Sequence, residues 1–205
     1  MEFLNQNEVV YNEERILRPD YYLPQDAAIS VNGKLCRLNA RIIILFHKPM
    51  GYVCSHKAQK NQKTIFSLLP ESYQKFFFAG RLDIDSRGLL VLSNDGSFIH
   101  DLSHPSKKEN KIYLVRASRP LAEKEIAKME HGFYLKKEFL KIEKIESLKK
   151  PAHYRFTLHH GKNREIRRLL EWFHIATMDL CRVKFSKFLL GKLKEGQYQV
   201  YDESA

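Results

Sequence analysis

The sequence is poor in cysteine and contains no long apolar run. Its three cysteines, Cys36, Cys54 and Cys181, lie far apart and form no Cys-x-x-Cys pair. This spacing argues against a disulfide framework or a zinc site, and it favours a reducing compartment. The longest apolar run, 42–46, is too short to cross a bilayer, and the polar N-terminus is unlike a signal peptide. We therefore expect a cytoplasmic protein that does not enter a membrane.

Acidic residues are outnumbered by basic ones. The 205 residues include 35 Lys and Arg against 24 Asp and Glu, which gives a formal net charge of +11. Clustered Lys and Arg release counterions when they bind a phosphate backbone, so this excess favours a nucleic-acid partner. The 13 Phe and 10 Tyr are enough for a sizeable core, which argues against disorder. The pattern of a DNA-binding helix-turn-helix is missing.

The order of predicted elements indicates one α+β domain that follows a short N-terminal segment. Residues 1–28 lack clear periodicity, so we expect an irregular arm, followed by a small hairpin that turns at Asn32 and Gly33. We assign residues 1–40 to this arm and hairpin, and residues 41–205 to the main domain. Helices are interspersed irregularly among its strands, without repeated strand–helix–strand units. This order favours a mixed, largely antiparallel sheet flanked by helices.

A charged loop lies between two predicted apolar strands. It contains Asp83 and Asp85 together with Arg81 and Arg87. One interpretation is that one aspartate caps a turn while the other pairs with an arginine. Paired carboxylates are also typical of glycosidases and of metal sites, but no third hard ligand lies nearby, and a single Trp is few for a glycosidase cleft. A reactive carboxylate beside a cationic substrate-binding surface is the remaining interpretation.

The clearest predicted helix follows Gly161 and carries a row of arginines. Apolar residues recur at the spacing of one helical face, namely Ile166, Leu169, Leu170 and Phe173. Arg164, Arg167 and Arg168 recur at the same spacing on an offset face. A solvated basic face is one interpretation. Because the apolar face predicts a packed helix, the arginines can also be held in a fixed direction, where they can bind a carboxylate or a phosphate.

Four motifs occur in a familiar order between residues 42 and 201. Lys48-Pro49-x-Gly51 comes first, and the segment 80–96 follows with the sequence GRLDIDSRGLLVLSNDG. Lys111-x-Tyr113-x-Val115 lies on a predicted strand, and the segment 161–168 reads GKNREIRR. Together these motifs resemble those of the RsuA-type branch of the RNA pseudouridine synthases, in which the second motif carries the catalytic aspartate.

The resemblance implies the pseudouridine synthase catalytic fold and an isomerase that converts uridine to pseudouridine. Asp83 would attack the target uridine at its anomeric carbon or remove a ribose proton. Arg167 would pair with Asp83 and keep it ionised, and Tyr113 would stack on the flipped-out uracil. The uracil would rotate and be rejoined through carbon. An isomerisation of this kind requires no cofactor and no metal.

The resemblance also implies a set of residues that bind the substrate. Arg81 would fill the space vacated by the flipped nucleotide or contact its backbone, Leu169 would line the pocket, and Lys48 would support it. The full set is Arg81, Lys48, Lys111, Lys162, Asn163, Arg164, Arg168 and Leu169.

We expect a monomer whose partner is structured RNA. Ribosomal RNA is favoured, the large subunit first, and transfer RNA is the alternative. Many members of the branch begin with a small alpha-L RNA-binding module, and the roughly 30 residues before Val31 are too few for it. A non-catalytic RNA-binding or ribosome-assembly protein on the same fold is the competing interpretation. The presence of Asp83, Tyr113 and Arg167 argues against it.

Overall fold

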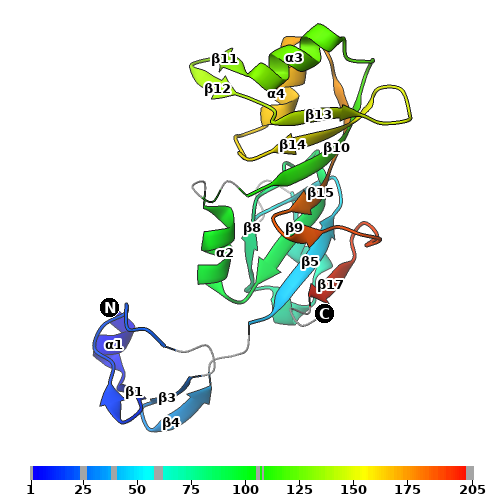
Figure 1. Cartoon of the computed structure of the whole chain (residues 1–205). Coiled ribbons are helices and arrows are strands. Elements are labelled where there is room, and N and C mark those ends of the chain that lie inside the picture. The colour runs from blue at the N-terminus through cyan, green and yellow to red at the C-terminus, as the bar shows by residue number, and fades with distance from the viewer. Residues whose placement is uncertain are drawn as a thin grey trace. The chain divides into compact units, whose positions relative to one another are not determined.

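The chain divides into two compact units, Met1–Ile42 and Ile43–Ala205. The computed structural model (Figure 1) describes residues 2–23, 27–37, 41–57, 62–104, 107 and 109–201. Within these residues, no helix is both long and apolar enough to span a membrane. The larger unit has 30 basic and 18 acidic residues, whereas the smaller unit has 5 and 6. The basic excess of the chain therefore belongs to the larger unit.

The smaller unit combines one short helix with a four-stranded antiparallel sheet of order β2-β1-β3-β4. Its elements are α1 (Glu2–Gln6), β1 (Val9–Tyr11), β2 (Glu14–Arg15), β3 (Ala28–Val31) and β4 (Lys34–Arg37). The predicted hairpin is confirmed as β3 and β4. Asn32 and Gly33 have φ angles of 50° and 75°, which suit the left-handed positions of a tight hairpin turn.

The expectation of an irregular arm over residues 1–28 is wrong for the part that the structure describes. Strand β1 pairs with β2 and also with β3, where Val9 lies opposite Val31. These strands are two to four residues long, which is too short for an alternating pattern to be visible in the sequence. Residues 24–26 lie outside the described residues, as does residue 40, where we expected the N-terminal segment to end.

The larger unit is built on a nine-stranded mixed sheet. Its main path runs β13-β14-β10-β15-β9-β5-β17, while β16 pairs with β15 and β8 pairs with β9. The strands are β5 (Ile43–Lys48), β8 (Phe77–Ala79), β9 (Arg87–Ser93), β10 (Lys111–Ala117), β13 (Lys144–Ser147), β14 (His153–Leu158), β15 (Thr177–Phe185), β16 (Phe188–Leu189) and β17 (Tyr198–Tyr201). The pairing of β15 with β9 is parallel, and the other pairings described in this sheet are antiparallel. The predicted fold class, α+β with a largely antiparallel sheet, is confirmed.

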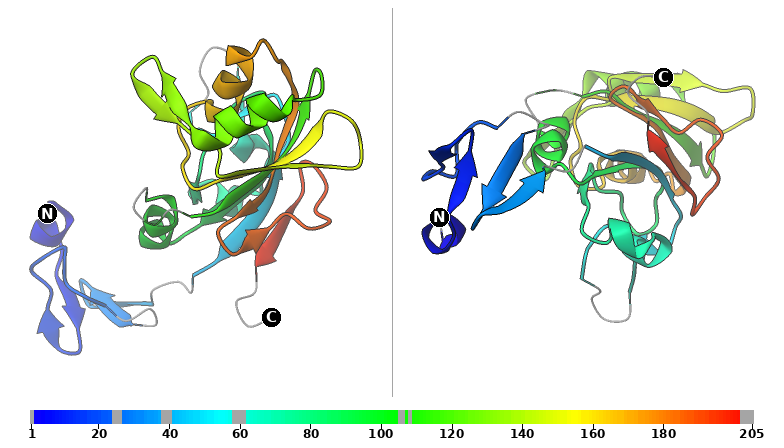
Figure 2. Two further views of the ribbon diagram at one scale, coloured as in Figure 1. Left: turned by 45° about the horizontal axis from the view of Figure 1, so that its top comes forward. Right: turned by 90° about the horizontal axis from the view of Figure 1, so that it is seen from below.

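Helices and short strand pairs complete this unit. They are α2 (Gly96–Ser103), α3 (Glu123–His131) and α4 (Glu165–Trp172), the 3-10 helices Ile65–Leu68 and Glu71–Tyr73, the parallel pair β6 (Tyr52–Val53) and β7 (Lys63–Thr64), and the hairpin β11 (Phe133–Leu135) and β12 (Glu138–Leu140). One core cluster packs α3 and α4 against β10, β13 and β14. Figure 2 shows α3 in green and α4 in orange against these strands. A second cluster lies between α2, β5, β9, β15 and β16.

The parallel contact between β9 and β15 joins the two halves of the sheet. Gly88 has a φ of +117°, and a Cβ placed there would lie 2.4 Å from the backbone N and O of Arg182. Arg87, the preceding residue, donates two hydrogen bonds to the Asp179 carboxylate, at 2.7 and 2.8 Å. Glycine is therefore needed at position 88, because any side chain would push the two strands apart.

We predict that Gly88→Ala severely destabilises the larger unit. The added methyl group collides with backbone atoms that cannot rotate away, so we expect a loss of about 3 kcal/mol or more in the free energy of unfolding. Urea unfolding followed by circular dichroism measures this loss. Gly196→Ala is the matched control, because its φ is also positive (+77°) but its Cβ would meet open space; backbone strain alone should cost about 1 kcal/mol. Equal losses in the two variants would contradict the collision.

Candidate functional site

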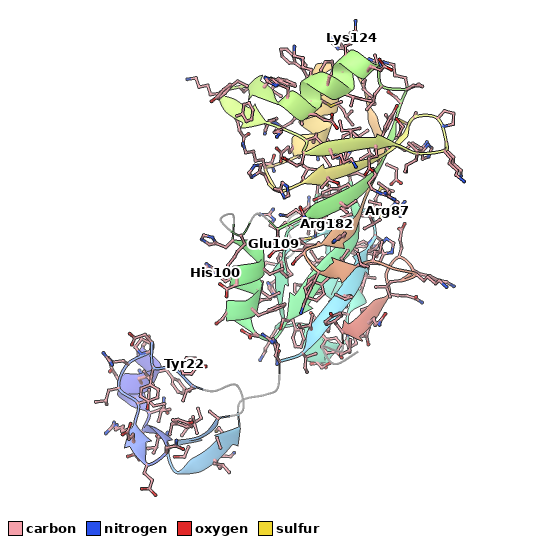
Figure 3. All side chains as sticks on the ribbon, in the orientation of Figure 1. Tyr22, Arg87, His100, Glu109, Lys124 and Arg182 are labelled. Carbon is pink, nitrogen blue, oxygen red and sulfur yellow. The ribbon has the colours of Figure 1, made fainter. Side chains whose placement is uncertain are left out.

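A cavity of about 1040 Å³ opens in the larger unit. Its lining comes from the loop between β8 and β9, from β10, from the turn before α4, and from β15. Four of the lining residues are Asp83, Tyr113, Arg164 and Arg182. Figure 3 labels Arg182 on β15 and Glu109 just before β10, and both belong to the lining. The cavity thus unites a carboxylate, a phenol and several cations that lie far apart in the sequence.

Lys48 fixes the loop that carries Asp83. Its side chain is fully buried at the end of β5, and its Nζ donates hydrogen bonds to the carbonyls of Pro49 and Asp83, both at 3.0 Å. A third hydrogen bond, of 2.6 Å, reaches the carbonyl of Ser86. Burial lowers the pKa of the Lys48 ammonium. Lys48 was predicted to support the pocket and was placed in the substrate-binding set. It supports the loop backbone and is absent from the described lining of the cavity.

The carboxylate of Asp83 projects from this fixed loop and lines the cavity. Its side chain is 29% exposed, and the nearest cation is Arg164, whose Nη1 lies 3.8 Å from Asp83 Oδ2. The preceding residue, Leu82, is buried and donates its backbone N–H to Cys54 Sγ at 3.5 Å. The backbone is therefore held on both sides of Asp83, while the carboxylate itself stays accessible.

The two arginines at the start of α4 bind Asp85 more closely than Asp83. Arg164 donates to both oxygens of Asp85, at 3.2 and 3.0 Å. Arg167 donates to the Asp85 carbonyl at 2.7 Å and to Ser86 Oγ at 3.2 Å, and its Nε lies 3.4 Å from Asp85 Oδ2. The predicted pairing of Arg167 with Asp83 is thus not what the structure has. Arg164 reaches both carboxylates, but the turn at residues 84–85 brings Asp85 closer to it, and Arg167 forms an ion pair with Asp85.

Asp85 is held in its charged form by these arginines. Burial by itself would raise the pKa of the Asp85 carboxyl group, but the hydrogen bonds from Arg164 and the charge of Arg167 outweigh it, and the net pKa lies below its ordinary value. Arg164 adopts a left-handed backbone conformation, with φ 48° and ψ 33°, at the N-cap of α4. This conformation costs a non-glycine residue energy, and the ion pair with Asp85 offsets part of that cost.

Strand β10 brings two more predicted residues to the cavity. Tyr113 and Lys111 lie two positions apart, so their side chains share one face of the strand, and both line the cavity. Lys111 Nζ lies 5.1 Å from the centroid of the Phe185 ring and donates to the Glu109 carbonyl at 3.1 Å. Burial lowers the pKa of the Lys111 ammonium. The phenol of Tyr113 therefore shares the cavity with Asp83 and a partly buried amine.

The remaining predicted residues divide into two groups. Arg81, Lys162 and Asn163 line the cavity, and the ammonium of Lys162 is hydrogen-bonded to the backbone carbonyl of Phe139. Arg168 and Leu169 are absent from the described lining.

The geometry of α4 explains this second group. Arg168 turns away to form an ion pair with Glu138 at 2.6 Å. Leu169 is fully buried in the core rather than on the described wall of the cavity. Ile166, which shares its apolar helical face, reaches the cavity instead.

Arg182 is a cavity residue that the sequence analysis missed. Its side chain is only 1% exposed. It donates to the carbonyls of Leu89 and Gly80, at 2.8 and 2.5 Å, and lies 5.0 Å from the Phe185 ring centroid. The sequence feature that could have identified Arg182 is its position as the single cation within the otherwise apolar segment 180–183. A charge at such a position needs fixed partners, and here the partners are the carbonyls around the charged loop.

Metal ligands do not gather in the part of the chain that the structure describes. Among those residues, no group of three or more His, Cys, Asp or Glu side chains is arranged to hold a metal ion.

Comparisons with known proteins agree on one family. The model of the RNA pseudouridylate synthase family matches residues 42–172. An uncharacterised RNA pseudouridine synthase of Borreliella burgdorferi is 34% identical over 165 residues, which cover 80% of this chain and 66% of that protein. Ribosomal large subunit pseudouridine synthase B of Pseudomonas aeruginosa is 32% identical over 187 residues, which cover 86% and 48% of the two chains. A crystal structure of a pseudouridylate synthase matches with a TM-score of 0.74 and 26% identity, over 99% of this chain and 89% of that one.

We predict that Lys48→Met lowers the free energy of unfolding by about 3 kcal/mol, because one buried and two part-buried carbonyls lose their donor. Chemical denaturation of both proteins measures the difference. Lys149→Met is the control, because Lys149 is exposed and its replacement should change stability by no more than about 0.5 kcal/mol. A Lys48→Met protein as stable as wild type would show that the loop does not depend on the ammonium.

We predict that the stability difference between wild type and Asp85→Asn depends on pH. Because the pKa of Asp85 is lowered in the folded state, the ion pairs add stability above the ordinary aspartate pKa of about 3.9, and this contribution is lost as the pH falls through the folded-state value. Since the side chain is 42% exposed, we expect about 1 kcal/mol at pH 7. Unfolding at pH 7 and pH 3, each repeated in 1 M NaCl, measures it. An equal gap at both pH values would rule out an ionic origin.

Proposed function

Because the chain belongs to the RNA pseudouridylate synthase family, we propose that it converts a uridine of a structured RNA to pseudouridine, with residues 41–205 as the catalytic domain. The observation that carries this proposal is the position of Asp83. Its carboxylate stands accessible on a loop that Lys48 fixes, and it shares a cavity with Tyr113 and Arg164. A nucleophile or base must be held in this way, since its geometry has to be set before the substrate arrives.

Asp83 is proposed to start the reaction. Its carboxylate attacks the anomeric carbon of the flipped-out uridine, or it removes a proton from the ribose, and the bond from that carbon to uracil N1 breaks. The uracil rotates within the cavity, and its C5 forms the new bond to the anomeric carbon. The bond from that carbon to Asp83 breaks at this step or, in the second route, the ribose regains the proton that Asp83 removed. The C5 proton then leaves and N1 gains a proton, so no atom is added or lost overall. Tyr113 lines the same cavity, and we assign to it stacking on the uracil and assistance in the departure of this proton.

The two arginines divide the work of supporting Asp83. Arg164 is the cation nearest to the Asp83 carboxylate, at 3.8 Å, and we assign to it the role of orienting that group. Arg167 acts as a positioning residue, because it binds the backbone at Asp85 and the hydroxyl of Ser86. This assignment revises the direct pairing of Arg167 with Asp83 that the sequence suggested.

The proposed substrate is large-subunit ribosomal RNA. The Pseudomonas relative carries that substrate in its name, and the basic excess of the larger unit favours a polyanion. Arg81 and Asn163 line the cavity and are exposed, so both are available to the RNA backbone next to the flipped nucleotide.

We predict that Asp83→Asn abolishes turnover and leaves RNA affinity within about twofold, because the amide keeps the shape of the side chain but is neither a nucleophile nor a base. The measurement is tritium release from ribosomal RNA labelled at uracil C5, with about a 1,000-fold loss expected. Asp85→Asn is the matched control. The same change two residues away removes an anchor of Arg164 and Arg167, so we expect a partial loss of about tenfold.

Two outcomes would contradict the proposal. Unchanged release by Asp83→Asn would mean that another residue is the reactive group. Wild type and Asp83→Asn could also release equally little tritium from the RNA of both ribosomal subunits. That result would favour the interpretation as a non-catalytic RNA-binding protein.

A further inference from the structure

The hairpin of β11 and β12, residues 133–140, carries two lysines at positions that disfavour lysine. Leu135 pairs with Glu138, so the turn consists of Lys136 and Lys137, both exposed. Their φ angles are 49° and 69°, the left-handed values that two-residue hairpin turns require and that Asn and Gly adopt most easily. The stability of the turn therefore favours Asn and Gly at positions 136 and 137. The presence of two lysines at these positions points to a functional use of their charges.

The outer face of the same hairpin is aromatic. Tyr134 lies directly opposite Phe139, so the two side chains share one face. Their ring centroids are 5.4 Å apart with the planes at 63°, and the side chains are 73% and 40% exposed. Exposed rings that already contact one another lose little conformational entropy when a flat partner stacks on them. Aromatic rings of this kind are the platforms on which proteins stack unpaired bases.

Contacts of the hairpin tie it to the cavity, to α4 and to Gly132. The carbonyl of Phe139 accepts a hydrogen bond from Lys162, which lines the cavity. Glu138 is bound by Arg168 of α4 at 2.6 Å. Phe139 lies on Gly132, where a Cβ would approach the ring to 2.5 Å. The hairpin is thus held beside the site.

The charge around the hairpin is net positive, since residues 128–144 contain five lysines and three glutamates. Glu138 is neutralised by Arg168, and Glu143 forms an ion pair with Lys141 at 3.4 Å. Lys128 lies over the Phe133 and Trp172 rings, 5.4 and 6.0 Å from their centroids, which adds a further cation on this side. A partner that offers both flat rings and regularly spaced negative charge matches this surface. Single-stranded RNA has both.

We propose that the hairpin of residues 133–140 binds RNA outside the catalytic cavity. Lys136 and Lys137 contact backbone phosphates, while Tyr134 and Phe139 stack on an unpaired base near the target uridine. The inference rests on the proposed function and extends it, because it assigns to this enzyme a preference for targets that have unpaired nucleotides next to the modified uridine.

The first test separates charge from folding. In Lys136→Asn/Lys137→Gly the turn receives the residues that its backbone favours, so the thermal midpoint should stay equal or rise while both charges are removed. The probe is a fluorescein-labelled RNA stem-loop with a uridine-containing loop, and anisotropy gives the affinity at several salt concentrations. We expect about tenfold weaker binding, with the slope of log K against log salt reduced by roughly 0.7–0.9 for each phosphate that the variant no longer neutralises.

Lys149→Ala/Lys150→Ala, at another exposed lysine pair, is the matched control and should bind within twofold of wild type.

The second test addresses stacking. Tyr134→Ala should weaken binding to the stem-loop about tenfold and binding to a blunt duplex of the same length less than twofold, whereas Tyr134→Phe should bind like wild type. Tyr22→Ala, at an 85% exposed tyrosine of the smaller unit, is the control and should leave both affinities unchanged.

Several results would overturn the inference. Wild-type affinity in the turn variant would do so, as would an equal loss of affinity in the Lys149→Ala/Lys150→Ala control, which would reveal only a diffuse positive field. Equal losses of affinity for stem-loop and duplex by Tyr134→Ala would exclude stacking. Because binding is measured without turnover, these outcomes are independent of tritium release, so a failure here is distinct from a failure of the isomerisation.

Discussion

The buried ammonium of Lys48 is the interaction on which the geometry of the site depends. A charge without exposure to water is costly unless polar groups surround it, and here the carbonyls of Pro49, Asp83 and Ser86 do so. Arg167 binds the same loop through the carbonyl of Asp85 and the hydroxyl of Ser86. Two cations therefore hold the backbone, and the Asp83 carboxylate is left to face the cavity. The carbonyls of the loop, rather than its acidic side chains, accept the hydrogen bonds of the buried ammonium.

The basic residues of this protein serve two purposes that composition cannot separate. Lys48 and Arg182 are buried and bind carbonyls, while Arg87 joins two strands through Asp179. These three charges serve the fold rather than a partner. In the proposed function, the field that attracts RNA comes from exposed lysines such as Lys136 and Lys137. A net charge of +11 thus indicates the class of partner correctly, but it overstates the number of cations that can meet a phosphate.

Sequence reasoning succeeded where a local pattern has one physical meaning. Apolar alternation predicted β10, and an apolar face predicted α4. The prediction of the partner of Arg167 failed because Asp83 and Asp85 are both acids of the same loop. The turn at residues 84–85 decides that Arg167 forms its ion pair with Asp85. Leu169 and Ile166 share a helical face, and which of them is covered depends on packing. The hairpin at residues 133–140 was missed because its turn contains lysines instead of Asn or Gly, the residues that mark such turns.

The close approach of Gly88 to Arg182 joins two strands that are far apart in the sequence, so the cavity can form only after both strands have been synthesised. The hydrogen bond from Arg182 to Leu89 joins residues 93 positions apart, and Arg164 stands at the start of α4, the helix that comes just before that strand. A nascent chain that has been synthesised as far as α3 already contains Asp83, Lys48 and Tyr113, yet it lacks both arginines that shape the cavity around them. Long-range closures of this kind form late in folding. The surroundings of Asp83 are therefore completed only after β15 has been synthesised, so a product truncated after α3 would carry the carboxylate without Arg164 and Arg182, which line the same cavity.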